Sequence, residues 1–319
     1  MKKVLIIMIF LVSSIYAQQT ALNSVLENIS IPNVQKAIDD ANALKEEVNE
    51  KNFKEFLKSW KKVEALYFAG EIDNDYLDSP RYIDIFHNLK EDLNKQMQRV
   101  ITSNDEPNIA LFKNSFKTIN ALEYVMFNDD KITQREKLLS IQILNSIVSH
   151  LKDIKDVYSK YLNEKPKSKT EKWENAMLIN TLIASTYRLK EWRIGDPSGN
   201  SSKYKDDANN KRAEYFLSKN SFEAIKSILK AHEEIMANNK FLSFGKMAAA
   251  SGAKAEVIEV QDAIKKSLNE LAKLAKFKID DFSNAKKLYK ASKNLHNAYY
   301  LSLIEQLSVT AKILDADGD

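Results

Sequence analysis

Residues 133–163, TQREKLLSIQILNSIVSHLKDIKDVYSKYLN, decide the fold because they carry the clearest helical pattern in the chain. Thr133 and Glu136 have the spacing of a capping box, in which two side chains bind free backbone N–H groups at the start of a helix. Apolar residues then follow at alternating spacings of three and four: Leu144, Ile147, Leu151, Ile154, Tyr158 and Tyr161. This near-heptad seam predicts a long helix packed in a bundle.

The rest of the chain predicts an all-α fold built in the same way. Apolar residues make up 44% of the 319 residues, whereas only 6 Gly and 5 Pro occur, which disfavours a β fold with many tight turns. The polar run 163–170 (NEKPKSKT) is broken by Pro166 and predicts a boundary between two packed helical bundles, residues 18–163 and 164–319. Further helices are expected over residues 82–100, 109–127, 173–192, 208–237, 255–276 and 283–314, with a loop at 195–202.

The N-terminus has the pattern of a secretion signal. Lys2 and Lys3 precede the apolar run 4–12, and small residues lead to an expected cleavage after Ala17, so residues 1–17 are predicted to be a signal peptide. An uncleaved anchor is the alternative, although the apolar run is short for a membrane span. The chain has no Cys, which excludes a lipoprotein. We therefore expect a periplasmic protein of a bacterial envelope, with no transmembrane segment in the mature chain.

The charge pattern excludes one class of partner. The formal net charge of +4 falls to +2 when Lys2 and Lys3 leave with the signal peptide, and the charges are interspersed. Since no basic stripe occurs, we expect no nucleic-acid partner.

Glu123 is the first candidate for a functional residue. It lies in the stretch 109–127 (IALFKNSFKTINALEYVMF), which reads as a buried helix, and Asn120 shares its apolar face. A carboxylate on such a face costs several kcal/mol unless a partner compensates for it. The partner could be a metal ion, an arginine or a ligand.

A second concentration of polar residues lies at 188–199 (RLKEWRIGDPSG). Arg188 and Glu191 are one turn apart, and Arg193 and Asp196 follow them. Guanidinium groups beside a Gly-rich loop could hold a carboxylate or a phosphate. They could equally stabilise the end of a helix.

The histidines and the common catalytic motifs give little indication of a catalytic or metal site. Asp84 and His87 would lie one turn apart on a helix, but the second Glu-x-x-His copy of a dinuclear bundle site is missing. His232 precedes two glutamates and is expected on a solvated face. Neither the His-Glu-x-x-His zinc motif nor the Gly-x-Ser-x-Gly nucleophile elbow occurs.

Three stretches together resemble the imelysin-like family of bacterial envelope proteins. Residues 118–124 (TINALEY) are similar to the family's Gly-x-His-x-x-Glu helix, and 188–199 to a loop with an Arg, a Gly and a Pro-Ser-Gly end. Residues 213–221 (AEYFLSKNS), with Glu214 and Ser218, are similar to a Glu-x-x-x-Ser segment. Residues 53–70 and the acidic end 315–319 are also similar, so the resemblance covers most of the mature chain.

The resemblance implies two helical bundles that share a cleft. The family is named for an insulin-cleaving peptidase activity, and related domains occur in iron-uptake systems, where the His and Glu of the motif are proposed metal ligands. In this chain Asn120 stands at the His position and Thr118 at the leading Gly. Asn is a poorer ligand than imidazole for a transition metal.

Three hypotheses follow. The first is a non-catalytic periplasmic binding protein for iron or another divalent or trivalent metal, with Glu123 as metal ligand or arginine partner and an iron-transport or envelope protein as partner. The second is a metallopeptidase, which would need three protein ligands and an open position. The third is a helical envelope adaptor with a broad exposed apolar patch.

Overall fold

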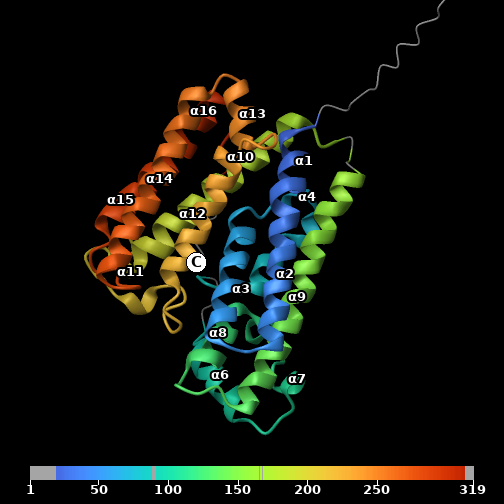
Figure 1. Ribbon diagram of the computed structural model, residues 1–319, viewed down its shortest axis with the longest axis vertical. Coiled ribbons are helices and arrows are strands. Elements are labelled where there is room, and N and C mark those ends of the chain that lie inside the picture. The colour runs from blue at the N-terminus through green and yellow to red at the C-terminus, as the bar shows by residue number, and fades with distance from the viewer. Residues whose placement is uncertain (1–18, 88–90, 165, 167, 313–319) are drawn as a thin grey trace, which may run out of the picture.

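The computed structural model describes residues 19–87, 91–164, 166 and 168–312 (Figure 1). These residues form helices joined by turns and loops, and no β-strand occurs among them, which confirms the all-α prediction. The predicted signal peptide and the acidic end 315–319 lie outside the described residues.

The first half of the chain packs around the long helix α9. Its helix α2 lies against both α3 and α9, and α8 packs on α9 (Figure 1). The helical elements of this half are α1 (Ala21–Val25), η1 (Leu26–Ser30), α2 (Ile31–Glu46), α3 (Glu50–Ala65), α4 (Ala69–Ile72), η2 (Asn74–Tyr76), α5 (Ser79–Ile83), α6 (Leu93–Thr102), α7 (Pro107–Ala110), η3 (Asn114–Lys117), α8 (Ile119–Phe127) and α9 (Gln134–Asn163).

The second half packs α12 and α15 against α14, while α10 and its extension contact α15. Its elements are α10 (Glu171–Arg188), η4 (Leu189–Gly195), α11 (Asp196–Ser198), η5 (Asn210–Arg212), α12 (Ser221–Ala237), α13 (Phe244–Ala250), α14 (Lys254–Phe277), α15 (Lys286–Asn297), η6 (Ala298–Leu303) and α16 (Ile304–Gln306).

Helix α9 has the predicted start and the predicted buried seam. The Thr133 hydroxyl accepts a hydrogen bond from the backbone N–H of Glu136, and the Glu136 carboxylate accepts one from the N–H of Thr133, so both parts of the capping box form. All six residues of the seam are buried.

The expected helix over 109–127 is wrong in its first half. The chain forms α7, turns, and forms the short 3₁₀ segment η3 before α8 begins at Ile119. Thr118 is extended and its hydroxyl accepts a hydrogen bond from the N–H of Ala121, so it caps a new helix. Phe112 consequently lies 71% exposed in the intervening turn.

The expected helix over 82–100 is also broken. Helix α5 ends at Ile83, and the backbone at Asp84 is extended, with φ −145° and ψ 122°. The next helix is capped by the carboxylate of Asp92, which accepts a hydrogen bond from the N–H of Lys95. Asp84 and His87 therefore do not lie one turn apart on a helix.

Two boundaries in the second half differ from expectation. Helix α10 continues without a break into the π-helical segment η4 and then into α11, so residues 195–198 of the predicted loop are helical. The helix ends at Gly199, whose backbone is left-handed with φ 67°. Helix α12 begins at Ser221 instead of residue 208, because residues 213–220 form turns with left-handed backbone at Tyr215 and Lys219.

The two halves are in direct contact through α3 and α12. The buried apolar residues of the described chain form one continuous cluster that includes members from both halves. The predicted boundary falls where α9 ends, and the division into two bundles at 163/164 stays a prediction. Among the described residues, no helix has the length and apolar character needed to cross a membrane.

Candidate functional site

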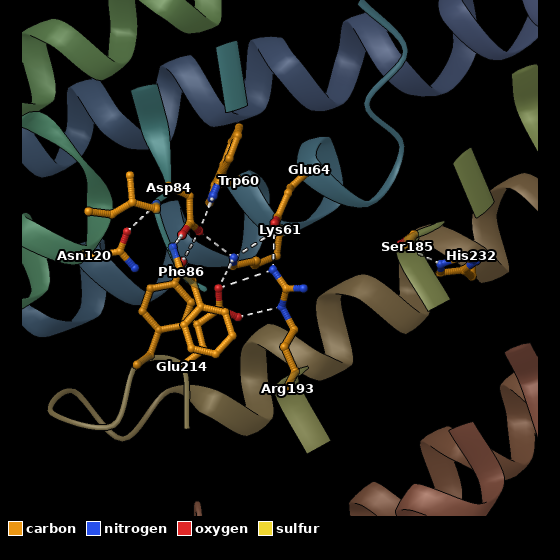
Figure 2. Close-up of polar contacts among 12 residues, drawn as sticks. Trp60, Lys61, Glu64, Asp84, Phe86, Asn120, Ser185, Arg193, Glu214 and His232 are labelled. Atoms are coloured by element: carbon orange, nitrogen blue, oxygen red, sulfur yellow. Dashed lines mark hydrogen bonds and ion pairs between the residues drawn. The ribbon is translucent and has the colours of Figure 1, made fainter. Parts of the chain in front are cut away.

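The centre of the candidate site is the ammonium group of Lys61, a side chain with no exposed surface. Its Nζ lies 2.7 Å from a carboxylate oxygen of Glu64, 2.6 Å from Asp84 and 2.5 Å from Glu214 (Figure 2). Lys61 and Glu64 come from one turn of α3, whereas Asp84 follows α5 and Glu214 lies in the turns before α12. Three carboxylates from separate parts of the chain thus meet at one buried cation.

Arg193, from the π-helical segment η4, binds the other side of this cluster. Its Nε lies 2.7 Å from Glu214, and its Nη2 lies 2.6 Å from Glu64 (Figure 2). With Lys61 and Arg193 both positive and the three carboxylates ionised, the cluster carries one net negative charge. We call these five residues, Lys61, Glu64, Asp84, Arg193 and Glu214, the charge network.

Asp84 is the most fully hydrogen-bonded carboxylate of the network. Its Oδ2 accepts hydrogen bonds from the Trp60 indole and the Tyr215 hydroxyl, both at 3.0 Å, in addition to Lys61. Its Oδ1 accepts one from the backbone N–H of Phe86 at 3.0 Å. These bonds require the extended backbone after α5, which explains why no helix runs through residue 84.

The electrostatics keep most of the network ionised. Burial acts to lower the pKa of Lys61, but the carboxylates of Asp84, Glu214 and Glu64 outweigh it and raise that pKa. Burial acts to raise the pKa of Asp84, but Lys61 holds it well below its usual range. For Glu214, burial prevails over Arg193 and Lys61 and raises the pKa.

A cavity of about 630 Å³ opens beside the charge network, between elements of both halves. Glu64 and Asp84 reach its wall from the network, and Arg188 reaches it from α10 and Trp192 from η4. Its volume lies in the range of small-molecule sites. The lining residues are Glu64, Tyr67, Gly70, Glu71, Leu77, Asp78, Pro80, Arg81, Asp84, Phe86, Met177, Asn180, Thr181, Ala184, Arg188, Trp192 and Lys312.

A contact across the halves lies next to the cavity. The rings of His87 and Trp192 stack with centroids 4.7 Å apart and planes 5° apart. The Nε2 atom of His87 also lies 2.7 Å from a carboxylate oxygen of Asp196, which is buried at the start of α11. His87 has a left-handed backbone, with φ 67°, so this contact is made at a conformational cost.

Glu123 is buried as expected, but it lies outside the cavity lining. Its Oε1 accepts a hydrogen bond of 2.9 Å from the backbone N–H of Ser218. Burial raises its pKa to about 7, although the Ser218 bond opposes the shift. The neighbouring Asn120 accepts a bond of 2.8 Å from the N–H of Ile85 (Figure 2). Both side chains therefore fix the segments that carry Asp84 and Glu214.

The remaining predicted residues separate into different surroundings. Arg193 and Glu214 pair with each other, whereas Arg188 lines the cavity. The carboxylate of Glu191 lies 2.8 Å from Lys190 and accepts a bond of 3.2 Å from the Tyr289 hydroxyl on α15. Within the described ranges, no hydrogen bond or ion pair joins Glu123 to either arginine.

Sequence reasoning missed Lys61 and Glu64 as members of the site, and it weighed Asp84 only as a helical neighbour of His87. The signal that marked Glu123 was also present at Lys61, because Leu57, Lys61 and Ala65 follow one another at four-residue spacing on the buried face of α3. Asp84 gave no such signal, since its role depends on partners distant in sequence.

The donor set does not fit a bound metal ion as the side chains stand. Within the described part of the chain, only Glu64, Asp84 and Glu214 bring three potential ligand atoms together, all within 4.8 Å of one another. The Lys61 ammonium is in contact with all three and takes the place that a cation would occupy. Glu123 lies outside this group, and its role as a metal ligand stays a prediction.

His232 corrects one expectation. The ring is fully buried, with Nε2 3.0 Å from the Ser185 hydroxyl and Nδ1 3.1 Å from the Tyr299 hydroxyl (Figure 2). Burial lowers its pKa to about 3, so the ring is neutral. This chain of hydrogen bonds joins α10, α12 and η6 inside the second half, and none of its three residues lines the cavity.

Comparisons with known proteins agree with this architecture. Residues 21–310 match the family model described as imelysin, whose short name marks a peptidase family. No curated protein matches the chain significantly.

Two solved structures share the fold. An imelysin-like protein from Psychrobacter arcticum 273-4 superposes with a TM-score of 0.74 at 15% sequence identity. The match covers 92% of this chain and 96% of the Psychrobacter chain. A protein named as an iron-regulated protein A precursor, from Parabacteroides distasonis ATCC 8503, superposes with a TM-score of 0.67 at 12% sequence identity. The match covers 90% of this chain and 94% of the Parabacteroides chain.

Proposed function

This chain belongs to the imelysin family, and we propose that it is a non-catalytic periplasmic protein that serves iron acquisition by binding a ligand in the cavity beside the charge network. The observation that carries the proposal is the cavity itself. Its walls come from both halves of the chain, and the buried ion pairs of Lys61 and Arg193 hold those walls in register. A site of this size with a few fixed polar groups is the usual form of a small-molecule site.

The association with iron has two supports, the family and the name of the Parabacteroides protein with the same fold. The charge network suggests how iron would be presented. Since Lys61 already compensates Glu64, Asp84 and Glu214, an unchelated ion would have to displace an ammonium from three carboxylates at once. We therefore propose that iron enters as a chelate, whose organic part contacts the cavity wall.

The charge network does not favour peptidase activity. A hydrolytic metal centre needs three protein ligands and an open position. Among the residues that the structure describes, the group that comes nearest is Glu64, Asp84 and Glu214, and its charges are compensated by Lys61 and Arg193.

Isothermal titration calorimetry of the full mature protein tests the proposal. Ferric tris-acetohydroxamate, a small iron chelate with no net charge, should bind the unaltered protein. Ala184→Phe, which places a ring in the cavity, should abolish that binding. Ala263→Phe is the matched control, because Ala263 is also a half-buried helical alanine but lies on α14, outside the cavity.

Two results would count against the proposal: no heat with ferric tris-acetohydroxamate, or equal binding by Ala184→Phe and the unaltered protein. Ferrous, cupric and zinc ions without chelator form a second arm. Their binding, if lost in Glu123→Ala, would support Glu123 as a metal ligand and contradict entry as a chelate.

An adaptor role is the second candidate, and a separate surface favours it. Ile109 and Phe112 are 60% and 71% exposed. They border another hollow, of about 650 Å³, whose rim includes Lys95 and Arg99. Cross-linking in the envelope, with Phe112→Ser as the variant, tests this role. Loss of a specific cross-linked protein would support docking at this surface.

A further inference from the structure

Nearly all charged side chains that line the cavity have partners. The carboxylates of Glu64 and Asp84 are bound by Lys61. At the outer wall, Glu71 lies 2.5 Å from the ammonium of Lys312. Asp78 and Arg81, also in the lining, form an ion pair of 3.1 Å.

Arg188 is the exception among the described residues. It is half-buried and lines the cavity, yet it forms no hydrogen bond and no ion pair with any other residue that the structure describes. Burial lowers the pKa of Arg188. The carboxylate of Glu64, which lies beyond ion-pair distance, opposes this shift only in part. A guanidinium has five N–H donors in a planar fork, so leaving it without an acceptor in a half-buried position is costly.

The helix places Arg188 with space around it. Ala184 lies one turn before Arg188 and Trp192 one turn after it, and all three line the cavity. The small side chain of Ala184 leaves room beside the guanidinium, and the indole of Trp192 offers an apolar surface. Phe86, Leu77 and Met177 add further apolar wall.

We propose that Arg188 anchors the carboxylate of a small organic monoanion whose apolar part lies against Trp192. The proposal rests on the proposed function, since it uses the same cavity. A carboxylate matches the guanidinium fork with two parallel hydrogen bonds. A dianion such as a phosphate monoester fits less well, because Glu64 and Asp84 form the adjoining wall and repel a second negative charge.

Carboxylates of the chain itself are another source of the same chemistry. Asp315, Asp317 and Asp319 follow the cavity residue Lys312 closely in sequence. The test therefore needs an arm in which these three residues are changed to Asn in the full-length chain.

The test uses phenylacetate as the probe, with the neutral isostere phenylacetamide and the dianion phenyl phosphate beside it, all without iron at pH 8. Calorimetry should show that phenylacetate binds and that the other two bind more weakly. Arg188→Gln should weaken phenylacetate binding about tenfold or more, the scale expected for a charge-assisted hydrogen bond. Arg188→Lys keeps the positive charge but loses the planar fork of donors. Its affinity for phenylacetate should lie between those of the unaltered protein and Arg188→Gln.

Arg212→Gln is the matched control, because Arg212 is also a half-buried arginine but lies outside the cavity lining and is already paired with Asp207. It should leave phenylacetate binding unchanged. Tighter binding in the triple-Asn variant would show that the chain's own carboxylates compete for Arg188 and would support a carboxylate site.

Three results would overturn the inference: equal binding of phenylacetate and phenylacetamide, equal binding by Arg188→Gln and the unaltered protein, or no binding to the unaltered and triple-Asn proteins. Because no iron is present, these outcomes are separate from the experiment with the neutral iron chelate. That chelate has no carboxylate and could still bind without Arg188, and a carboxylate could bind in a protein that takes no iron.

Discussion

Two buried ionisable residues in the first half of the chain are stabilised in different ways. Lys61 is surrounded by three carboxylates, which more than compensate for the loss of water. Glu123 is hydrogen-bonded to Ser218 and forms no ion pair with any residue that the structure describes, and the negative charges of Glu214 and Asp84 act against its ionisation. Burial of the Glu123 carboxylate is therefore tolerated most easily when it carries a proton.

Glu123 should make stability depend on pH. Its pKa is raised from 4.5 to about 7 by burial, so the folded protein binds the proton more tightly than the unfolded chain. Stability is therefore lost as pH rises from 4.5 to 7. At pH 8 the Glu123→Gln variant should be more stable than the unaltered protein, by up to about 3 kcal/mol, because its amide oxygen can still accept the Ser218 bond.

Urea unfolding at pH 5 and pH 8 measures this effect. The difference between the two proteins should shrink at the lower pH, where Glu123 is protonated. The same difference at both pH values would contradict a raised pKa.

At the scale of elements, the π-helical segment η4 sets the geometry of the site. It directly continues α10 and carries Trp192 and Arg193. A π-helical turn holds more residues than an α-helical turn, so it changes the direction of the side chains that follow. Here Trp192 lines the cavity while the next residue, Arg193, lies buried in the charge network.

The start of α9 offers a direct test of an element that the sequence predicts. Thr133→Ala removes the hydroxyl that accepts the N–H of Glu136 and should lower the free energy of unfolding by roughly 0.5–2 kcal/mol. Thr133→Ser keeps the hydroxyl and is the control, with little expected change. Chemical denaturation followed by circular dichroism measures both. An Ala variant as stable as the Ser variant would show that the capping box does not stabilise α9.

At the scale of the whole molecule, the charge network and the shared core connect the two halves. Lys61 and Glu64 lie on α3, and their partners Arg193 and Glu214 belong to the second half. The packing of α3 on α12 continues the buried apolar cluster between the halves. A break in this contact should therefore affect both halves together.

Lys61→Met should lower the free energy of unfolding by roughly 3–5 kcal/mol, because it leaves buried carboxylates without their cation. Lys58→Met is the control on the same helix, since Lys58 and its partner Glu55 are both partly exposed and the pair should contribute less than about 1 kcal/mol. In the unaltered protein, circular dichroism and tryptophan fluorescence should report one coincident transition in urea. Two separated transitions would show that the halves unfold independently.

Much of the fold could be predicted from the sequence because helical periodicity is a local property. The seam of α9 and its capping box repeat a pattern within a few residues, and both occur as expected. Breaks within helical patterns were harder to predict. Asp84 leaves the helical conformation because Trp60, Lys61 and Tyr215 bind its carboxylate, and no local pattern reports those partners.

The candidate site was predictable only in part, for the same reason. Glu123 and Arg188 could be recognised as candidate site residues because each is a charged residue within a stretch that has a helical pattern of apolar residues. The surroundings of these two side chains could not be predicted. The Glu123 carboxylate accepts a hydrogen bond from a backbone N–H of the segment 213–220, whereas Arg188 lies on the cavity wall.

The sequence by itself determined that the chain is all-α, where α9 begins, and which family it resembles, because periodicity, capping and motif order are properties of neighbouring residues. The tertiary structure alone decided which charges meet. Lys61 on α3, Asp84 after α5, Arg193 on η4 and Glu214 before α12 are brought together by packing between the halves. The same packing leaves Arg188 without a partner among the described residues, because only the arrangement of distant segments determines which charges are compensated and which face a cavity.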